Sequence, residues 1–189
     1  MTEHDPPDLV ALPFATLRTI LQQLDDRLSQ RAVHALRQAG YAGGAELADS
    51  FDRRVRAQGE GDAAELPLEE FNARVASFFE SAGWGGTAIN SIHDLVAAVD
   101  VSDCWEPRAQ RATSGPCCHV TTGVIASFFT TFAPYTLGAM EVECAASGHS
   151  HCRFLLGPPE VLDELYSHLE RGSDYTAALA QLSGVSASA

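Results

Sequence analysis

The sequence predicts an α+β domain in which an antiparallel sheet of about four strands packs against helices. The first 81 residues carry apolar positions at three- and four-residue spacing, which is typical of amphipathic helices. Two later regions each hold a pair of short runs rich in β-branched residues around turn residues, as β-hairpins do. Helical segments lie between and after these hairpins, and this order indicates an α+β domain rather than a parallel α/β sheet.

Three helices are expected before the first hairpin, over residues 13–38, 45–57 and 66–81. We expect the glycine-rich segment Gly40–Gly44 to separate the first two helices. We interpret the apolar stripe of the first helix as core, and a dimerisation surface is the alternative. That stripe consists of Phe14, Leu17, Leu21, Leu24 and Leu28.

Two hairpins and two further helices complete the predicted domain. A helix that begins at Pro116 and reaches Phe132 is apolar almost all round, so we expect it to lie at the centre of the fold. A last helix is expected from Pro158 to Arg171. The four expected strands are 87–92, 95–101, 136–144 and 152–156.

The chain of 189 residues has the length of one domain. We expect a flexible arm over residues 1–12, a single domain over 13–172, and a short helix with a flexible tail over 173–189. With 46% apolar residues the domain can build a core of its own.

The charge balance excludes several classes of function. There are 25 acidic and 12 basic residues, a net charge of −13, and every basic residue is Arg. We therefore expect no direct binding of nucleic acid, and the absence of Lys excludes a Schiff base and a P-loop lysine. No signal peptide and no membrane span is apparent, so we expect a cytoplasmic protein.

Four of the five Cys lie between residues 117 and 152, and in a cytoplasmic chain such a cluster favours a metal site over disulfides. Cys118 is expected at a helix N-terminus, where the thiolate is favoured, and Cys144 and Cys152 are expected to face each other across a turn. Glu141 and Cys144 should point to opposite faces of a regular strand unless a bulge or the strand end intervenes. The candidates for a fourth ligand are Glu141, Glu143, His119, His149 and His151.

Three segments resemble the 4-vinyl reductase domain family, over about residues 12–171. They are 39–48 with its glycines, Pro116–Gly123 with its Cys-Cys-His, and 141–154 with its two Cys. The family includes the sensory modules of phenol- and xylene-responsive transcriptional activators and the bacteriochlorophyll biosynthesis protein J. Its fold is related to the TRAPP vesicle-tethering subunits.

The resemblance implies a zinc site, because the aromatic sensors hold zinc with residues that correspond to Cys118, Glu141, Cys144 and Cys152. Four protein ligands leave no open position, so such a zinc would stabilise the fold rather than catalyse. Ala139 stands where the sensors have a Tyr, which is a departure from their pattern.

An apolar pocket between the central helix and the sheet is the second expected feature. Most of the aromatic residues near it would be core, and a few would line the pocket, with His93 and Trp105 as polar contacts. The candidate ligand-binding residues are Phe78, Trp84, His93, Trp105, Phe128, Phe132 and Tyr135.

These expectations together describe a zinc-containing module that binds or senses a small hydrophobic molecule, hydrocarbon or aromatic, as a homodimer. One alternative is an accessory or carrier protein in chlorophyll-type tetrapyrrole synthesis, and another is a protein-interaction module without a ligand. No nicotinamide or flavin motif is visible, so the sequence favours a protein that is not an enzyme. Any signalling role would require a separate partner protein.

Overall fold

The computed structural model describes residues 11–25, 30–59, 61–110 and 115–182. Most of the expected N-terminal arm, Leu28 and the residues 183–189 lie outside these ranges. Seven α-helices are present in the described part of the chain. They are α1 (Phe14–Asp25), α2 (Gln30–Ala57), α3 (Leu68–Ser81), α4 (Trp105–Ala109), α5 (His119–Phe132), α6 (Pro159–Glu170) and α7 (Tyr175–Leu179).

The predicted α+β class with a four-stranded antiparallel sheet is confirmed. Each hairpin pairs its own two strands, and the strand order is β1-β2-β4-β3, so the second hairpin joins the first through β4. The strands are β1 (Gly86–His93), β2 (Val96–Ser102), β3 (Gly138–Glu143) and β4 (Cys152–Gly157).

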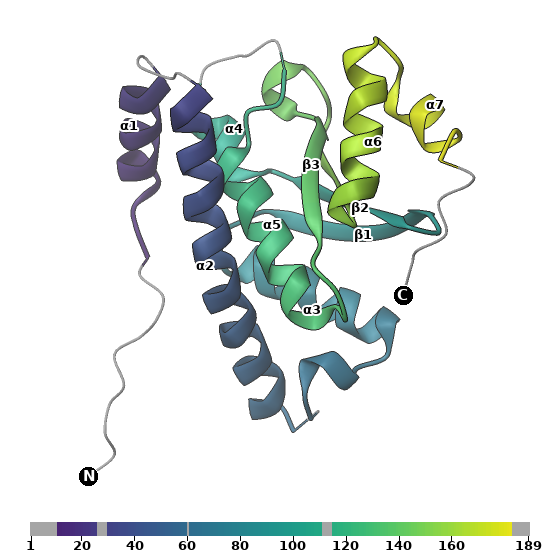
Figure 1. Ribbon diagram of the computed structural model, residues 1–189. Coiled ribbons are helices and arrows are strands. Elements are labelled where there is room, and N and C mark those ends of the chain that lie inside the picture. Colours follow the sequence, from purple (N-terminus) through teal and green to yellow (C-terminus); the bar gives the residue numbers. More distant parts are fainter. Residues whose placement is uncertain (1–10, 26–29, 60, 111–114, 183–189) are drawn as a thin grey trace.

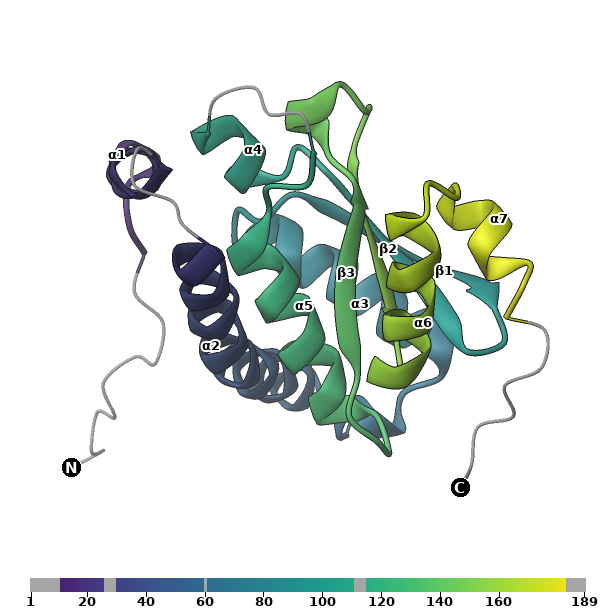
Figure 2. The same ribbon diagram turned by 45° about the horizontal axis from the view of Figure 1, so that its top comes forward.

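Helices cover both faces of this sheet (Figure 1). In Figure 2, α5 and α2 lie on one side of the strands and α6 and α7 on the other, with the edge strand β3 between them. One cluster of buried side chains fills the space between the sheet and α2, α3 and α5. A smaller cluster lies under α6 and α7.

The expected break at Gly40–Gly44 is wrong, because α2 runs through this segment without interruption. The glycines allow α2 to approach α5 closely. A Cβ on Gly40 would lie 2.0 Å from the carbonyl oxygen of Val120, and one on Gly123 would lie 2.1 Å from that of Arg37. The close packing of the two helices therefore outweighs the weak helix propensity of glycine.

The central helix was expected to begin at Pro116, and in the structure α5 begins at His119 with Cys118 as its N-cap residue. A buried carboxylate stabilises this start. Glu106 on α4 accepts hydrogen bonds from the backbone N–H groups of Val120 and Thr121, at 3.0 and 2.9 Å. The short helix α4, which the sequence pattern did not predict, thus supplies the acceptor for two N–H groups that a helix N-terminus leaves unpaired.

No helix in the described part of the chain is both long enough and apolar enough to span a membrane.

Candidate metal centre and apolar cavity

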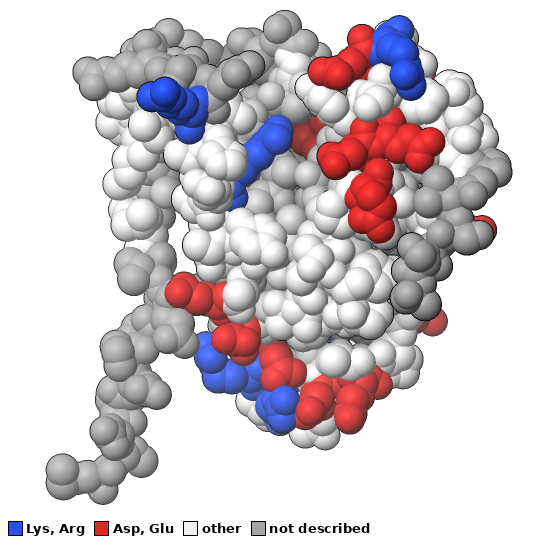
Figure 3. Space-filling view, in the orientation of Figure 1, with Lys and Arg blue, Asp and Glu red and all other residues white. Residues whose placement is uncertain are grey.

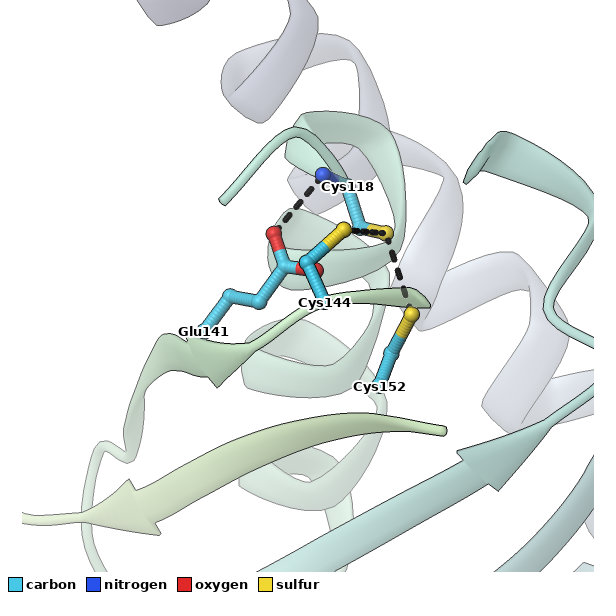
Figure 4. A group of neighbouring side chains, drawn as sticks. All are labelled: Cys118, Glu141, Cys144 and Cys152. Carbon is cyan, nitrogen blue, oxygen red and sulfur yellow. Dashed lines mark hydrogen bonds between the residues drawn. The ribbon is translucent and has the colours of Figure 1, made fainter. Parts of the chain in front are cut away.

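The four side chains that the resemblance implied as ligands lie together in the structure (Figure 4). One ligand atom from each of Cys118, Glu141, Cys144 and Cys152 lies within 4.8 Å of the others, and all four residues are buried. They come from three places in the fold: the N-cap of α5, strand β3 with the residue after it, and the first residue of β4.

A β-bulge resolves the strand-parity conflict between Glu141 and Cys144. Glu141 pairs with Phe154 and Glu143 with Arg153, so one step along β4 corresponds to two steps along β3. The extra residue on β3 is Val142, and the bulge bends the strand. Because β3 also ends at Glu143, Cys144 can turn to the same side as Glu141.

The turn between β3 and β4 brings the last two thiols together. A short 3₁₀ helix covers Ala145–Ser147, and Gly148 follows in the left-handed region at φ +100°, which glycine adopts without strain. The backbone N–H of Ala145 points at the Sγ atom of Cys152, 3.4 Å away. This geometry places Cys144 and Cys152 side by side, as the spacing predicted.

The distances fit a tetrahedral thiolate site. The Sγ atom of Cys118 lies 4.0 Å from that of Cys144 and 3.6 Å from that of Cys152. Zinc with Zn–S bonds of about 2.3 Å would separate its sulfur ligands by about 3.8 Å. Glu141 accepts a hydrogen bond from the Cys118 backbone N–H through Oε2 at 2.8 Å, whereas its Oε1 atom is buried without a hydrogen-bond partner. That oxygen is available as the fourth ligand atom.

The electrostatics of the protein alone disfavour the charged forms of these groups. Burial raises the pKa of Glu141 to about 8. Hydrogen bonding with the neighbouring thiols, Cys104 first, together with burial raises the pKa of Cys118. A bound cation reverses both effects, because it stabilises the thiolates and the carboxylate that it contacts.

The alternative fourth ligands lie outside the group. Glu143 accepts a hydrogen bond from the Tyr175 hydroxyl at 2.7 Å, and its other oxygen lies 3.8 Å from Nδ1 of His149. Nε2 of His151 lies 3.4 Å from Asp100. His119 belongs to α5 and is half-buried, where burial, reinforced by Arg37, lowers its pKa.

Two further thiols adjoin the group, although the sequence assigned them no role. The Sγ atom of Cys117 lies 3.4 Å from that of Cys144. Cys104 lies 3.9 Å from the hydroxyl of Thr121, and both Cys are buried. All five Cys of the chain are therefore free thiols in one buried region.

A small apolar cavity lies between α5 and the sheet. Its free volume is about 10 Å³, the size that admits about one water molecule. Two buried polar atoms in this region have no hydrogen-bond partner: the hydroxyl oxygen of Thr87, which lines the cavity, and the indole Nε1 of Trp105. The cavity is lined by Phe79, Trp84, Thr87, Val99, Val101, Thr121, Ile125 and Phe129.

The candidate ligand-binding residues separate into three groups in space. Trp84 lines the cavity, and Trp105 packs against it edge-on with ring centroids 5.8 Å apart. Phe78, Phe128 and Phe132 belong to an aromatic cluster around Phe51.

His93 and Tyr135 form the third group and do not lie at the cavity. His93 is at the β1–β2 turn, where its Nδ1 accepts a hydrogen bond from the Leu95 N–H, and Tyr135 is exposed. The sequence reasoning missed Thr87 and Thr121, since two threonines in a strand and a helix carry no signal of a cavity.

Residues 97–158 match the family model of the 4-vinyl reductase domain. This segment is a 4-vinyl reductase domain. The family predicted from the sequence is thereby confirmed, and the matched segment of the domain contains all four residues of the candidate metal group. No curated protein matches the chain by sequence.

Solved structures share the fold of the 4-vinyl reductase domain and its flanking helices at low sequence identity. The phenol-responsive sensory domain of the transcription activator PoxR, solved with phenol, is 18% identical with a TM-score of 0.66, over 80% of this chain and 77% of that chain. A vinyl-4-reductase family protein from Methanocaldococcus jannaschii is 14% identical with a TM-score of 0.52, over 79% and 83%. A trafficking protein particle complex subunit 3 from Naegleria fowleri, covalently bound to palmitic acid, is 11% identical with a TM-score of 0.55, over 76% and 91%.

Proposed function

We propose that this chain is a zinc-stabilised module that binds and senses a small, mostly apolar molecule. One helix carries this proposal. α5 begins with Cys118 of the metal group and continues with Thr121, Ile125 and Phe129 of the cavity. A ligand in the cavity would therefore press on the same helix that the metal attaches to β3 and β4.

Zinc suits the donor set better than a hard cation. Three thiolates and one carboxylate are soft to intermediate ligands, and their spacing is that of a tetrahedron. When bound, the ion would supply a structural crosslink, since the four side chains would occupy every position of a tetrahedral site. The residues of this chain would hold the start of α5 against the second hairpin.

The chemistry of the cavity supports a hydrocarbon or aromatic ligand with one oxygen atom. The walls are aromatic and aliphatic, and the Trp105 N–H can only donate, whereas the Thr87 hydroxyl can donate or accept. A hydroxyl or carbonyl oxygen would give these buried groups the partners they lack. The likeness in fold to the sensory domain of PoxR, solved with phenol, agrees with a ligand of this class.

Ligand entry would require the cavity to widen, because its present volume is smaller than an aromatic ring. Trp84 is the side chain suited to move. It lies between Gly83 and Gly85, whose φ angles of +81° and +110° are accessible to glycine at low energy. A tetrapyrrole is far larger than this cavity, so the carrier hypothesis gains no support from it.

Tryptophan fluorescence tests the ligand proposal directly. The chain has only two Trp, and both lie at the cavity, so any change in emission reports on this site. With phenol as the probe, we expect saturable quenching or a spectral shift, measured alongside isothermal titration calorimetry. Trp105→Phe, which keeps an aromatic ring and removes the N–H, should weaken binding about tenfold.

Tyr135→Phe is the matched control, because it removes one polar group from an exposed ring outside the cavity. It should leave phenol affinity unchanged. Absence of saturable binding for phenol and for a short aliphatic alcohol would contradict the proposal. Native mass spectrometry gives the zinc content separately, with one ion per chain expected.

The homodimer is a separate proposal, and α1 is the surface that favours it. This helix packs on α4, where Phe14 lies under the Arg108 guanidinium at 5.0 Å. It nevertheless leaves Ile20 exposed. Light scattering should give twice the chain mass, and Ile20→Glu should shift it toward the monomer.

A further inference from the structure

The outer edge of β3 has no strand beside it. Among the described residues β3 pairs only with β4, at the end of the order β1-β2-β4-β3. In Figures 1 and 2 this edge faces the viewer between α5 and α6, and no other described element crosses it. An edge strand presents a row of N–H and C=O groups that can pair with a further strand.

A groove of about 640 Å³ follows this edge. Its floor includes the five consecutive residues Gly138–Val142. Because successive side chains of a strand point to opposite faces, a consecutive run can line the groove only if the groove spans both faces and the edge between them. At about 3.3 Å per residue this run is long enough to pair with a short strand.

The two walls of the groove differ in character. On one side α6 contributes Leu162, Tyr166 and Leu169, and Tyr166 is 53% exposed. On the other side lie Arg37 of α2 and Pro116. An apolar wall with an exposed Tyr is the kind of surface that anchors side chains of a partner.

The charge of α6 favours a basic partner on that wall. This helix carries Glu160, Asp163, Glu164 and Glu170, all exposed, and it has no Arg. Asp163 lines the groove, and Asp174 lies at its end. Acidic side chains gather over α6 on the hollowed front face (Figure 3). Arg37 makes the opposite wall positive, so a bound strand would be read differently on its two faces.

We propose that an extended segment of a partner protein adds to β3 as a fifth strand of the sheet. Its backbone pairs with the free edge of β3, as in recognition by β-augmentation. The side chains on one face are apolar and basic and lie along α6, with a basic group beside Asp163. Those on the other face are neutral or acidic and lie toward Arg37. The groove is separate from the cavity of the proposed function, so this inference does not depend on the ligand.

The test uses a designed probe on the full chain. The probe is an acetylated and amidated heptapeptide, Thr-Leu-Thr-Arg-Thr-Leu-Thr, whose Leu and Arg side chains share one face when it is extended. We expect saturable binding by fluorescence anisotropy, together with slower hydrogen exchange of β3 amides. The same peptide methylated on alternate backbone nitrogens, or with Glu in place of Arg, should bind at least tenfold more weakly.

A matched pair of variants locates the site. Asp163→Arg reverses the charge within the groove, and Glu164→Arg makes the same change one residue further along α6, outside the lining of the groove. We expect Asp163→Arg to weaken peptide binding about tenfold and Glu164→Arg to change it less than twofold, with both variants folded by circular dichroism. The proposal is overturned if the peptide gives no protection of β3 amides, or if both variants weaken binding equally.

Discussion

The carboxylate of Glu141 accepts a hydrogen bond from the backbone N–H of Cys118 at 2.8 Å, across 23 residues of sequence. This bond joins the bulged edge strand β3 to the start of the central helix α5. It also orients Glu141 so that its second oxygen is left for the thiol group. The candidate metal centre is thus built into the contact between the two layers.

Removal of the metal should destabilise the whole domain. A ligand present at a thousandfold excess over its Kd stabilises the folded state by about 4 kcal/mol, which corresponds to roughly 8–16 °C in Tm for a chain of this size. We expect this loss on chelation and for Cys118→Ser, measured by scanning calorimetry with zinc content determined in parallel. Cys104→Ser is the control, since Cys104 adjoins the group without belonging to it, and it should retain zinc. Full zinc content in Cys118→Ser would refute the ligand assignment.

Glycine at position 40 should be essential to the packing of α2 on α5. The Cβ of Gly40→Ala would lie 2.0 Å from a backbone oxygen, which cannot move aside without separating the helices. We expect this variant to lose about 3 kcal/mol of unfolding free energy in urea titrations. Gly43→Ala on the same helix meets no atom within 4 Å and should gain up to about 1 kcal/mol. Equal effects of the two variants would contradict the packing argument.

The buried carboxyl of Glu106 should make stability depend on pH. Burial raises its pKa to about 7, from an ordinary value of 4.5, although the hydrogen bonds from Val120 and Thr121 oppose the increase. The folded protein therefore holds this proton more tightly than the unfolded chain does. Its contribution to the free energy of unfolding is greatest below pH 4.5 and is lost as the pH rises toward about 7.

Between pH 5.5 and 7.5 we expect this carboxyl to reduce the free energy of unfolding by roughly 2 kcal/mol. Glu106→Gln cannot ionise, so it should lose that part of the pH dependence while it keeps one acceptor oxygen for the start of α5. The measurement is urea unfolding of both proteins at saturating zinc, which keeps the metal contribution matched. An unchanged slope in the variant would show that other groups cause the dependence.

Arg153 should stabilise the junction of β2, β4 and α7. Its guanidinium donates to both carboxylate oxygens of Asp100 at 2.6 and 2.8 Å, and to the Tyr175 hydroxyl at 2.9 Å. Because Lys cannot form this planar arrangement, Arg153→Lys should reduce unfolding free energy by about 1–2 kcal/mol. Arg171→Lys, at an exposed position after α6, should change it by less than about 0.5 kcal/mol. The urea midpoints of the two variants provide the comparison.

The sequence by itself determined the class of the fold, most of its elements and the residues of the metal group. Local periodicity and turn chemistry predicted both hairpins, α3 and α6, because these depend on patterns within short windows. The residue types and the spacing of Cys118, Cys144 and Cys152 were visible without coordinates.

Only the tertiary structure decided the rest, since it depends on contacts between distant segments. α2 continues through Gly40–Gly44 because α5 packs against those glycines, and no window of sequence reveals that contact. The bulge at Val142 turns Glu141 toward the thiols, while Tyr175 and His149 engage Glu143 elsewhere. The strand order likewise leaves the edge of β3 open, because it follows from which hairpin edges meet when both faces of the sheet are buried.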